Sequence, residues 1–456
     1  MVDKKDQAHS ADQPGAGWST EGLGYFKHGE ERQRVFVFCP YLTQRKLEGL
    51  ARSPEARLEE AKGLAVAIDV DLVGGELVSL RAIKPATYLG QGKLDEIKTQ
   101  VKAKELDLVV FDCELSPIQQ RNLERVLLVK VIDRTALILE IFGARASTKE
   151  GELQVELAHL IYQRSRLVRS WTHLERQRGG GGFMGGPGET QIEADRRIIA
   201  DRIVRIKKQL EAVSRTRGLH RARRKKAPYP TIALVGYTNA GKSTLFNKVT
   251  KAKVVAEDML FATLDPTLRS IDLPSGRKVI LSDTVGFISE LPTMLVAAFR
   301  ATLEEVLEAD IIVHVRDASH PDSDVQKQDV ITVLQELGVD LVDIEKGTPV
   351  LEALNKLDLM DADSRQALEA YAERHEEAIP LSGLTGEGNE HLITAIDQIL
   401  SEQDFVIEQL VPYSDGATQS WIHANARIMG EEHGEDGIRY NFTVDPIAWA
   451  KFSRKH

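Results

Sequence analysis

The sequence predicts a multi-domain α/β protein with a doubly wound, mostly parallel sheet in its central part. A chain of 456 residues exceeds what one hydrophobic core usually serves. Short β-branched runs alternate with helical patterns, which is typical of α/β folds, and a glycine-rich loop joins one such strand to a helix near residue 240. We expect a disordered tail (1–24), an α/β domain (25–150), a basic helical hairpin (151–227), the central α/β domain (228–403) and a small α/β domain (404–456).

Composition excludes several classes of protein. The 42% hydrophobic and 28% charged residues are typical of soluble globular domains rather than fibrous or disordered chains. The two cysteines, Cys39 and Cys113, are too few for a disulfide framework and lack zinc-site spacing, which favours a reducing compartment. The first residues contain no apolar stretch that could serve as a signal peptide, and no run of about 18 apolar residues follows. We therefore expect a cytoplasmic protein.

The segment from 25 to 150 alternates strand-like and helix-like patterns. Apolar runs begin at Val35, Leu108 and Val126, and charged helical patterns cover 94–104 and 116–125. Gly90-Gln-Gly92, followed by a lysine, could be a phosphate-binding loop, but two glycines and one lysine are weak support for one. A turn that begins a helix is the better interpretation of this stretch.

Two long helical patterns follow, with a glycine-rich stretch between them. The first has a seven-residue seam, interrupted by Arg164, and the second has apolar residues at spacings of four and three: Leu153, Leu157, Leu160, Leu167, Trp171 and Leu174, then Ile199, Ile203, Ile206, Leu210 and Val213. The stretch from Arg178 to Gln191 is too rich in glycine to hold a helix or a packed strand. These patterns predict a helical hairpin with a flexible, exposed tip.

The predicted hairpin carries a strong positive charge. Residues 161–226 hold 18 basic and 6 acidic side chains, a net charge of +12, although the whole chain stands at −10. Arginines flank the tip on both arms: Arg164, Arg166, Arg169, Arg176 and Arg178 on one, and Arg196, Arg197, Arg202 and Arg205 on the other. This charge favours a phosphate-rich partner, and RNA is the expected target. The alternative is an inert intramolecular coiled coil with a long loop.

A strand, a glycine loop and a helix occur in succession after residue 230. The β-branched run TIALV leads into Gly236-Tyr-Thr-Asn-Ala-Gly241-Lys242-Ser243 and then into the helical TLFNKVT. This is the context of a P-loop, in which backbone N–H groups point at the phosphates of a nucleoside triphosphate. In such a loop Lys242 bridges the β and γ oxygens, and the Ser243 hydroxyl binds Mg²⁺.

A second motif identifies the base. Asn355-Lys356-Leu357-Asp358 follows an apolar run and begins 113 residues beyond the P-loop lysine. The Asp358 carboxylate can accept both N1–H and N2–H of guanine, and adenine lacks the N2 amine, so guanine is favoured. Ser382-Gly383-Leu384 then supplies a loop whose backbone can meet the guanine O6.

Two further segments point to the γ-phosphate and its metal ion. Asp283 ends an apolar strand 41 residues past the P-loop lysine, where a ligand to Mg²⁺-bound water is needed, and Gly286 can present its N–H to the γ-phosphate. Upstream, the loop 261–267 offers a second hydroxyl to Mg²⁺, for which motif register favours Thr263 over Thr267. Such a threonine is ordered only while phosphate and metal are bound, so hydrolysis would release the loop.

Two positions suggest how hydrolysis is controlled. Many GTPases place a glutamine after Asp-x-x-Gly to orient the attacking water, whereas this chain has Phe287 there. A phenyl ring cannot hydrogen-bond water, so we expect slow hydrolysis by the isolated protein and stimulation by a partner. Asn239 in the P-loop is similar to the asparagine of GTPases that recruit K⁺, and a purely loop-stabilising role is equally open.

The remaining patterns complete the central and C-terminal parts. Helical patterns at 300–308, 323–337, 364–374 and 389–399 alternate with the runs IIVHV and PVLEAL, as in a doubly wound nucleotide-binding fold. His314, within IIVHV, is expected to be a packed strand residue rather than a catalyst. A separate short region begins at Phe405, where FTVDPIAWAKF is typical of a strand and a helix, and nothing in it suggests catalysis.

These motifs resemble those of translation-factor-related GTPases and, more narrowly, the HflX family. GQGKLDEI, ELAHLIYQRSRLVRSW, GPGETQIEADRRII, GYTNAGKST, LFATLDPT and DTVGFI occur in the order of the family, and GPGETQ before a basic helix is the most discriminating. The resemblance implies a GTP hydrolase that binds GTP and GDP and attaches to the large ribosomal subunit through its N-terminal and hairpin parts. Splitting of ribosomes under stress is the described activity of the family. We also expect a monomer, with peripheral membrane association as a further partner prediction.

The motifs and the resemblance together define a candidate site. The residues expected to bind nucleotide are Gly236, Tyr237, Thr238, Asn239, Ala240, Gly241, Lys242, Ser243, Thr244, Phe261, Ala262, Thr263, Leu264, Asp265, Asp283, Thr284, Val285, Gly286, Asn355, Lys356, Leu357, Asp358, Ser382, Gly383 and Leu384. We expect Lys242, Thr263 and Gly286 to act in catalysis, Ser243, Thr263 and Asp283 to hold Mg²⁺, and K⁺ to bind near Asn239. A rival hypothesis is an RNA-binding or ribosome-assembly scaffold in which GTP is only a regulatory switch. A tRNA-modifying GTPase is disfavoured, because the C-terminal region lacks a reactive cysteine.

Overall fold

The computed structural model describes residues 32–43, 52–177, 187–224, 229–252, 260–261, 263, 266–290, 305–339, 347–402, 404–444, 449 and 452–453. In the hairpin it describes side chains only at 149–167, 193–213 and 215. Three predicted nucleotide-binding residues, Ala262, Leu264 and Asp265, lie outside these ranges, as do the predicted tail and residues 178–186 of the predicted tip. None of the described helices is long and apolar enough to cross a membrane.

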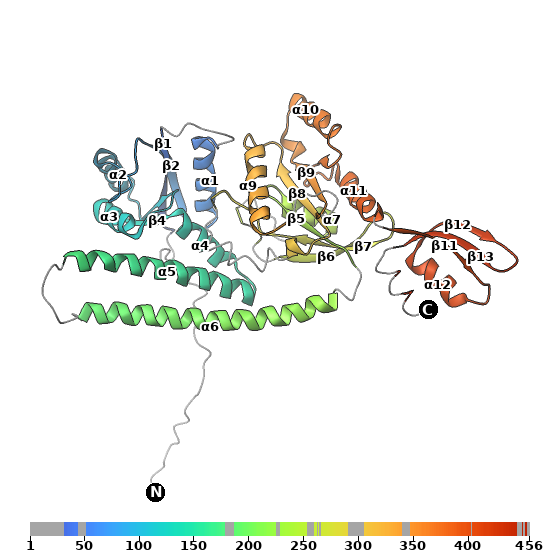
Figure 1. Ribbon diagram of the computed structural model, residues 1–456. Coiled ribbons are helices and arrows are strands. Elements are labelled where there is room, and N and C mark those ends of the chain that lie inside the picture. Colours follow the sequence, from blue (N-terminus) through green and yellow to red (C-terminus); the bar gives the residue numbers. More distant parts are fainter. Residues whose placement is uncertain are drawn as a thin grey trace, which may run out of the picture.

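The N-terminal part folds around a four-stranded parallel sheet with strand order β2-β1-β3-β4 (Figure 1). Its elements are β1 (Arg34–Leu42), α1 (Pro54–Val66), β2 (Asp71–Leu80), α2 (Gln91–Ala103), β3 (Leu108–Phe111), α3 (Pro117–Leu127), β4 (Lys130–Asp133) and α4 (Arg134–Arg145). Strands β1, β3 and β4 are mostly buried and apolar, as parallel strands covered by helices on both faces require, whereas the edge strand β2 is mostly half-buried.

Two local predictions in this part have different outcomes. Helix α2 begins directly after Gly90, so the glycine pair is a helix start, as predicted. The strand expected from Val126 was wrong at its beginning, because Val126 lies in the last turn of α3 and β4 starts only at Lys130. A capping box at Ser116 starts α3, and Leu128 ends it in the left-handed conformation.

Helices α5 (Lys149–Gln177) and α6 (Pro187–Arg224) lie side by side and form the predicted hairpin (Figure 1). Their contact is an apolar seam built from the predicted residues, with Leu153, Leu160, Ile203 and Ile206 buried at its centre. The seam residues Trp171 and Leu174 lie outside the described side chains. Helix α6 begins inside the stretch that we expected to be non-helical, because proline fits the first turn of a helix, where its missing N–H is not needed.

The central part is a six-stranded sheet with strand order β10-β9-β8-β5-β7-β6. Its elements are β5 (Thr231–Val235), α7 (Lys242–Thr250), β6 (Thr267–Asp272), β7 (Lys278–Asp283), β8 (Ile311–Asp317), α9 (Ser323–Glu336), β9 (Val350–Asn355), the 3-10 turn η2 (Leu357–Leu359), α10 (Ala362–Ala372), β10 (Ala378–Pro380) and α11 (Asn389–Glu402). All neighbouring strands are parallel except β6 and β7, which confirms the predicted fold class. The loops after β5, β7, β9 and β10 therefore meet at one edge of the sheet, where ligands of such folds bind.

The C-terminal part is a small antiparallel sheet with strand order β11-β13-β12. It contains β11 (Phe405–Val411), α12 (Gly416–Asn425), β12 (Arg427–His433) and β13 (Ile438–Val444). One face of the sheet packs on α12 and on aromatic residues that follow β13. In Figure 1 this sheet lies beyond α11, on the side of the molecule opposite the end of α5 that leads to the hairpin tip.

The two parallel sheets share one hydrophobic core. A single cluster of buried residues includes Val35 and Ile138 from the N-terminal part together with Val235, Phe287 and Val330 from the central part. The edge-to-face contact of Phe142 in α4 with Phe261 belongs to it, with ring centroids 4.6 Å apart. The N-terminal part is therefore packed directly against the loops of the central part.

Candidate functional site

The P-loop joins β5 to α7 at the carboxyl end of the central sheet. Its backbone turns through the left-handed region at Asn239 (φ +59°) and Gly241 (φ +91°). A Cβ atom on Gly241 would lie 2.2 Å from Nδ2 of Asn355, so only glycine fits between the loop and the end of β9. Helix α7 begins directly after this turn, and its N-terminal end opens onto the loop, which is the arrangement that binds phosphate.

Lys242 places a buried cation at the centre of this loop. Its Nζ donates hydrogen bonds to the backbone oxygens of Gly236 (3.1 Å) and Tyr237 (2.8 Å). Burial lowers the pKa of the Lys242 ammonium to about 8, although the Asp283 carboxylate acts in the opposite direction. The two carbonyl dipoles do not replace an anion, so the ammonium is suited to a negatively charged oxygen at the loop.

The three residues expected to hold Mg²⁺ lie together. The Ser243 hydroxyl donates to Oδ2 of Asp283 at 2.7 Å, and the Thr263 hydroxyl donates to the same oxygen at 3.0 Å. The two hydroxyl oxygens are 2.7 Å apart. They come from α7, from the loop before β6 and from the end of β7, so the fold rather than the local sequence brings them together.

The chemistry of this trio fits Mg²⁺. All three side chains offer oxygen, the ligand that this ion prefers. The second carboxylate oxygen of Asp283, Oδ1, is buried and has no hydrogen-bond partner among the described atoms. Burial also raises the pKa of the Asp283 carboxyl, while the hydrogen bond from Ser243 lowers it. A hydrated cation beside Ser243 and Thr263 would supply both the missing partner and the missing positive charge.

The segment after β7 runs alongside the P-loop through backbone hydrogen bonds. The Thr238 N–H donates to the Phe287 carbonyl at 2.7 Å, and the Phe287 N–H donates to the Gly236 carbonyl at 3.0 Å. Gly286 approaches the loop so closely that a Cβ there would lie 2.8 Å from the Thr238 Cα and 3.0 Å from the Lys242 Nζ. The backbone of Gly286 therefore lies beside the position where a terminal phosphate would meet Lys242.

Phe287 is not available for chemistry. Its side chain is 2% exposed and belongs to the core shared by the two sheets. The position at which many GTPases hold a water-orienting glutamine thus serves packing in this chain. The buried hydroxyl of Thr238 has no hydrogen-bond partner among the described atoms.

The predicted guanine-binding residues converge at the carboxyl ends of β9 and β10. The Asn355 side chain donates to the Ala240 carbonyl at 2.8 Å and accepts from the Gly383 N–H at 2.8 Å. It therefore ties the P-loop to the loop after β10. The Ser382 hydroxyl donates to Oδ1 of Asp358 at 2.5 Å, which orients that carboxylate.

Lys356 and Leu357 complete this motif. Lys356 has φ +71°, and its ammonium pairs with Oδ2 of Asp317 at 2.8 Å. Asp317 ends β8 and was not predicted from the sequence, although a carboxylate at the end of a central strand is a signal for it. Leu357 is buried at the start of η2.

Several predicted residues have side chains that point away from the loop. The Thr284 hydroxyl donates to the Leu234 carbonyl at 2.6 Å inside the sheet, and Val285 is buried in the shared core. Phe261 packs on α4, as described above. Leu384 is 67% exposed, and Thr244 lies partly buried in the first turn of α7.

His314 is a packed strand residue, as predicted. It is buried in β8, and burial lowers its pKa to about 3, so the imidazole is neutral.

A buried charge cluster that the sequence did not predict joins the N-terminal part to the P-loop. The Tyr237 hydroxyl donates to Oε2 of Glu60 in α1 at 2.5 Å and accepts from the Ser289 N–H at 2.9 Å. Arg52 donates to the same Glu60 oxygen at 2.6 Å and to the Ser289 hydroxyl at 2.7 Å. The cluster therefore connects α1, the P-loop and the segment after β7.

A second arginine completes the cluster. Arg134 donates to Oε1 of Glu60 at 2.6 Å, to Oδ1 of Asp112 at 2.5 Å and to the Ser289 carbonyl at 3.0 Å. Arg52 and Arg134 match Glu60 and Asp112 in charge, and these four side chains are at most 7% exposed. At the margin of the cluster, Asp322 lies 3.5 Å from Arg52 and Arg57 lies 3.6 Å from Asp112. Burial and the Glu60 carboxylate raise the pKa of the Tyr237 hydroxyl, which therefore remains a hydrogen-bond donor.

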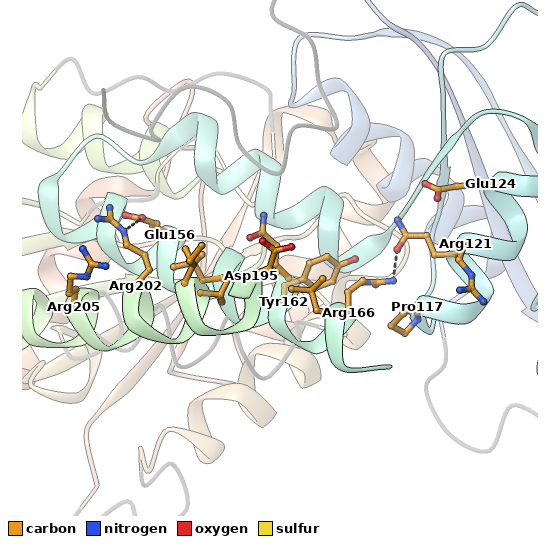
Figure 2. A pocket seen from close by; sticks show the side chains of 15 residues that line it. Pro117, Arg121, Glu124, Glu156, Tyr162, Arg166, Asp195, Arg202 and Arg205 are labelled. Carbon is orange, nitrogen blue, oxygen red and sulfur yellow. Dashed lines mark hydrogen bonds and ion pairs between the residues drawn. The ribbon is translucent and has the colours of Figure 1, made fainter. Parts of the chain in front are cut away.

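A cavity of about 840 Å³ lies between α3, α5 and α6 (Figure 2). Its charged lining consists of four arginines and three carboxylates, which are Arg121, Arg166, Arg202 and Arg205 with Glu124, Glu156 and Asp195. Arg166 donates to Oδ2 of Asp133 at 2.6 Å and Arg202 donates to Oε1 of Glu156 at 2.7 Å. Two arginines that were predicted to flank the tip thus pair within the protein. The side chains of Arg169, Arg176 and Arg178 lie outside the described residues.

Three family models match the chain, in an order that follows its three larger parts. The family described as "GTP-binding GTPase N-terminal" matches residues 55–143, and "GTP-binding GTPase Middle Region" matches residues 145–224. The family described as "50S ribosome-binding GTPase" matches residues 231–356. These segments are the four-stranded sheet without β1, the hairpin, and most of the P-loop sheet.

Known proteins are similar to the chain over most of its length. GTPase HflX of Magnetococcus marinus is 51% identical over 83% of this chain and 86% of its own length. GTPase HflX of Escherichia coli is 45% identical over 87% of this chain and 92% of its own length. A GTP-binding protein from Sulfolobus solfataricus, solved in complex with GDP, is 25% identical over 80% of this chain and 98% of its own, with a TM-score of 0.43.

Proposed function

This chain belongs to the HflX family of ribosome-associated P-loop GTP hydrolases, and on that basis we propose that it binds the large ribosomal subunit, hydrolyses GTP there and splits or rescues stalled ribosomes under stress. The observation that carries the proposal is the match of residues 231–356 to the "50S ribosome-binding GTPase" family. The site geometry and the basic hairpin support it. We also propose that the chain is divided into the five parts 1–24, 25–150, 151–227, 228–403 and 404–456, and that the protein is a cytoplasmic monomer.

The phosphate end of the proposed site works through preplaced charge. The Lys242 ammonium, already buried, would meet the β and γ oxygens, and the Gly286 N–H beside it would meet the γ-phosphate. The Ser243 and Thr263 hydroxyls would hold Mg²⁺, with Asp283 acting through a bound water. When bound, Mg²⁺ neutralises charge that develops on the phosphate oxygens.

The guanine end of the proposed site depends on two oriented groups. Asp358, held by the Ser382 hydroxyl, would accept both N–H groups of the guanine edge. The Gly383 backbone, held by Asn355, would lie near the guanine O6. Because Asn355 also ties this loop to Ala240, base binding and the shape of the P-loop are mechanically joined.

Hydrolysis in the proposed cycle depends on the ribosome. Phe287 is buried and cannot orient water, so a group from the ribosome or a movement of the switch segments must complete the site. We propose Asn239 as a ligand for K⁺, a second cation, and its left-handed backbone equally suits a purely structural role. Equal hydrolysis rates in K⁺ and Na⁺ buffers would exclude the ion.

RNA contact in the proposal uses the exposed face of α6. Arg196, Arg197, Arg205, Lys207 and Lys208 are exposed on this helix, which contacts α5 along only one side. Such cations bind the phosphate backbone and release counterions. We therefore expect hairpin binding to weaken steeply with salt.

The proposal is tested by light scattering of intact 70S ribosomes with GTP, with a nonhydrolysable analogue and without nucleotide. We expect splitting only with triphosphate, and ribosomes should accelerate GTP hydrolysis. Arg196→Glu should lower affinity for the large subunit about tenfold at low salt, and the exposed Arg374→Glu, outside the hairpin, should change it less than about twofold. Binding without splitting under every nucleotide would favour the rival scaffold function instead.

A further inference from the structure

The hairpin and the C-terminal part differ in charge. Residues 404–456 contain 8 acidic and 5 basic side chains, a net charge of −3, whereas the hairpin segment 161–226 has a net charge of +12. Figure 1 shows the C-terminal sheet far from the end of α5 that leads to the hairpin tip. A polyanion that attracts the hairpin is not attracted by the C-terminal part, so the two parts suit neighbours of different chemistry.

The two edges of the C-terminal sheet are built differently. The β12 edge has a register shift between Ile428 and Gly430, and charged residues follow at Glu431 and Glu432. Bulges and charges of this kind prevent another strand from pairing. The β11 edge, FVIEQLV, contains no lysine, glycine or proline, and its pairing with β13 is regular from Phe405 to Val411. Its one charge is Glu408, which lies 3.4 Å from Arg439 of β13, so this edge lacks the bulge and the consecutive charges of β12.

Strand β11 also exposes apolar side chains at this open edge. Val406 is 68% exposed and Leu410 is 50% exposed, and both lie on the face opposite α12 with Glu408 between them. The side chains that alternate with them face α12, where Val411 is buried. Among the described residues, β11 hydrogen-bonds to β13 alone, so its other side offers a row of backbone donors and acceptors.

We propose that β11 accepts an added strand, an extended basic segment of a protein of the large ribosomal subunit. This inference rests on the proposed function. Backbone pairing would supply affinity, and side chains at alternate positions would supply specificity. A partner segment with the pattern apolar, any, basic, any, apolar places its apolar residues beside Val406 and Leu410 and its cation beside Glu408.

Charge argues against two other occupants. Pairing of β11 with β11 of a second copy, centred on Glu408, would set two carboxylates opposite each other and bring together two C-terminal parts that each have a net charge of −3. RNA is repelled by the same charge. A basic protein segment is the occupant for which both the field and the edge are favourable.

The proposal is tested by photo-crosslinking with the full chain, a GTP analogue and purified large ribosomal subunits. A benzophenone amino acid replaces Val406 or, as a matched control, Met429, which is 62% exposed on β12. Co-sedimentation of each of the two labelled variants with the large subunit is measured on the same samples. We expect position 406 to crosslink to one ribosomal protein, within a segment of the stated pattern, and position 429 to give no such product.

Affinity measurements complete the test. Val406→Lys combined with Leu410→Lys should weaken subunit binding about tenfold while GTP hydrolysis by the free protein is unchanged, and Met429→Lys should leave binding within about twofold. Co-sedimentation with crosslinks only to RNA, to a second copy or to nothing would overturn the inference and leave the proposed function intact. Absence of co-sedimentation would overturn the proposed function and this inference with it.

Discussion

Replacement of the buried Lys242 by methionine should make the nucleotide-free protein more stable at neutral pH. The pKa of this ammonium falls from 10.5 to about 8 in the folded chain. At pH 7 both states carry the proton, so burial of the charge costs the folded state about 3 kcal/mol. Methionine has a similar length and no charge, and the P-loop accepts its apolar stem.

The hydrogen bonds of Lys242 reduce this gain. Its Nζ donates to the carbonyls of Gly236 and Tyr237, but each keeps a backbone donor, from Phe287 at 3.0 Å and from Ala240 at 3.3 Å respectively. Their loss therefore costs about 1–2 kcal/mol in total, because neither carbonyl is left unpaired. We expect Lys242→Met to be more stable than the wild type by about 1–2 kcal/mol at pH 7.

The pH dependence identifies the cause. A pKa lowered on folding means that the unfolded chain binds more protons between pH 8 and 10.5, so Lys242 makes the wild type gain stability through that window. The difference between variant and wild type should shrink by about 2 kcal/mol from pH 7.5 to 9.5. The free energy of unfolding is measured at each pH by urea denaturation, in which brief subtilisin digestion reports the unfolded fraction of the central domain. Lys248→Met, on the exposed face of α7, is the control. A difference that is constant from pH 7.5 to 9.5 would refute the reasoning.

Three further predictions concern the nucleotide. GTP supplies anions to Lys242, so binding at pH 8.5 should take up about 0.7 proton, measured by calorimetry in buffers of different ionisation enthalpy; no uptake would contradict the buried ammonium. Asp358→Asn should lower GTP affinity by at least about 100-fold and favour xanthosine triphosphate, whose C2 carbonyl can accept from the new amide; equal loss for both nucleotides in competition binding would exclude this role. Gly286→Ala puts a Cβ 2.8 Å from the Thr238 Cα. We expect kcat to fall about 100-fold in rapid-quench assays while GTP affinity stays nearly constant. An unchanged kcat would show that the backbone at this position is not positioned for the reaction.

Most of the fold was predictable because its signals are local. The P-loop, the alternating strands and the hairpin seam each lie within a short window, and the structure contains them. Errors arose where neighbouring residues compete for an element. The run from Val126 is apolar enough for a strand, but the helix started by Ser116 continues through it. In the same way, Pro187 starts α6 inside a stretch whose glycine content argued against a helix.

The charge cluster beside the P-loop was not predictable, because a motif describes the path of the backbone and not the direction of each side chain. Tyr237 was assigned to nucleotide from its place in the loop, and its carbonyl does accept from Lys242. Its hydroxyl lies on the other side of the chain and bonds to Glu60, which is 177 residues earlier in the sequence. One residue thus contacts Lys242 of the P-loop with its backbone and the N-terminal part with its side chain. Since Glu60 and its arginines are buried, loss of a single charged member would leave one charge of the cluster unbalanced, which costs about 3–5 kcal/mol. The cluster is therefore constrained as one unit, by contacts that no single segment of the sequence reveals.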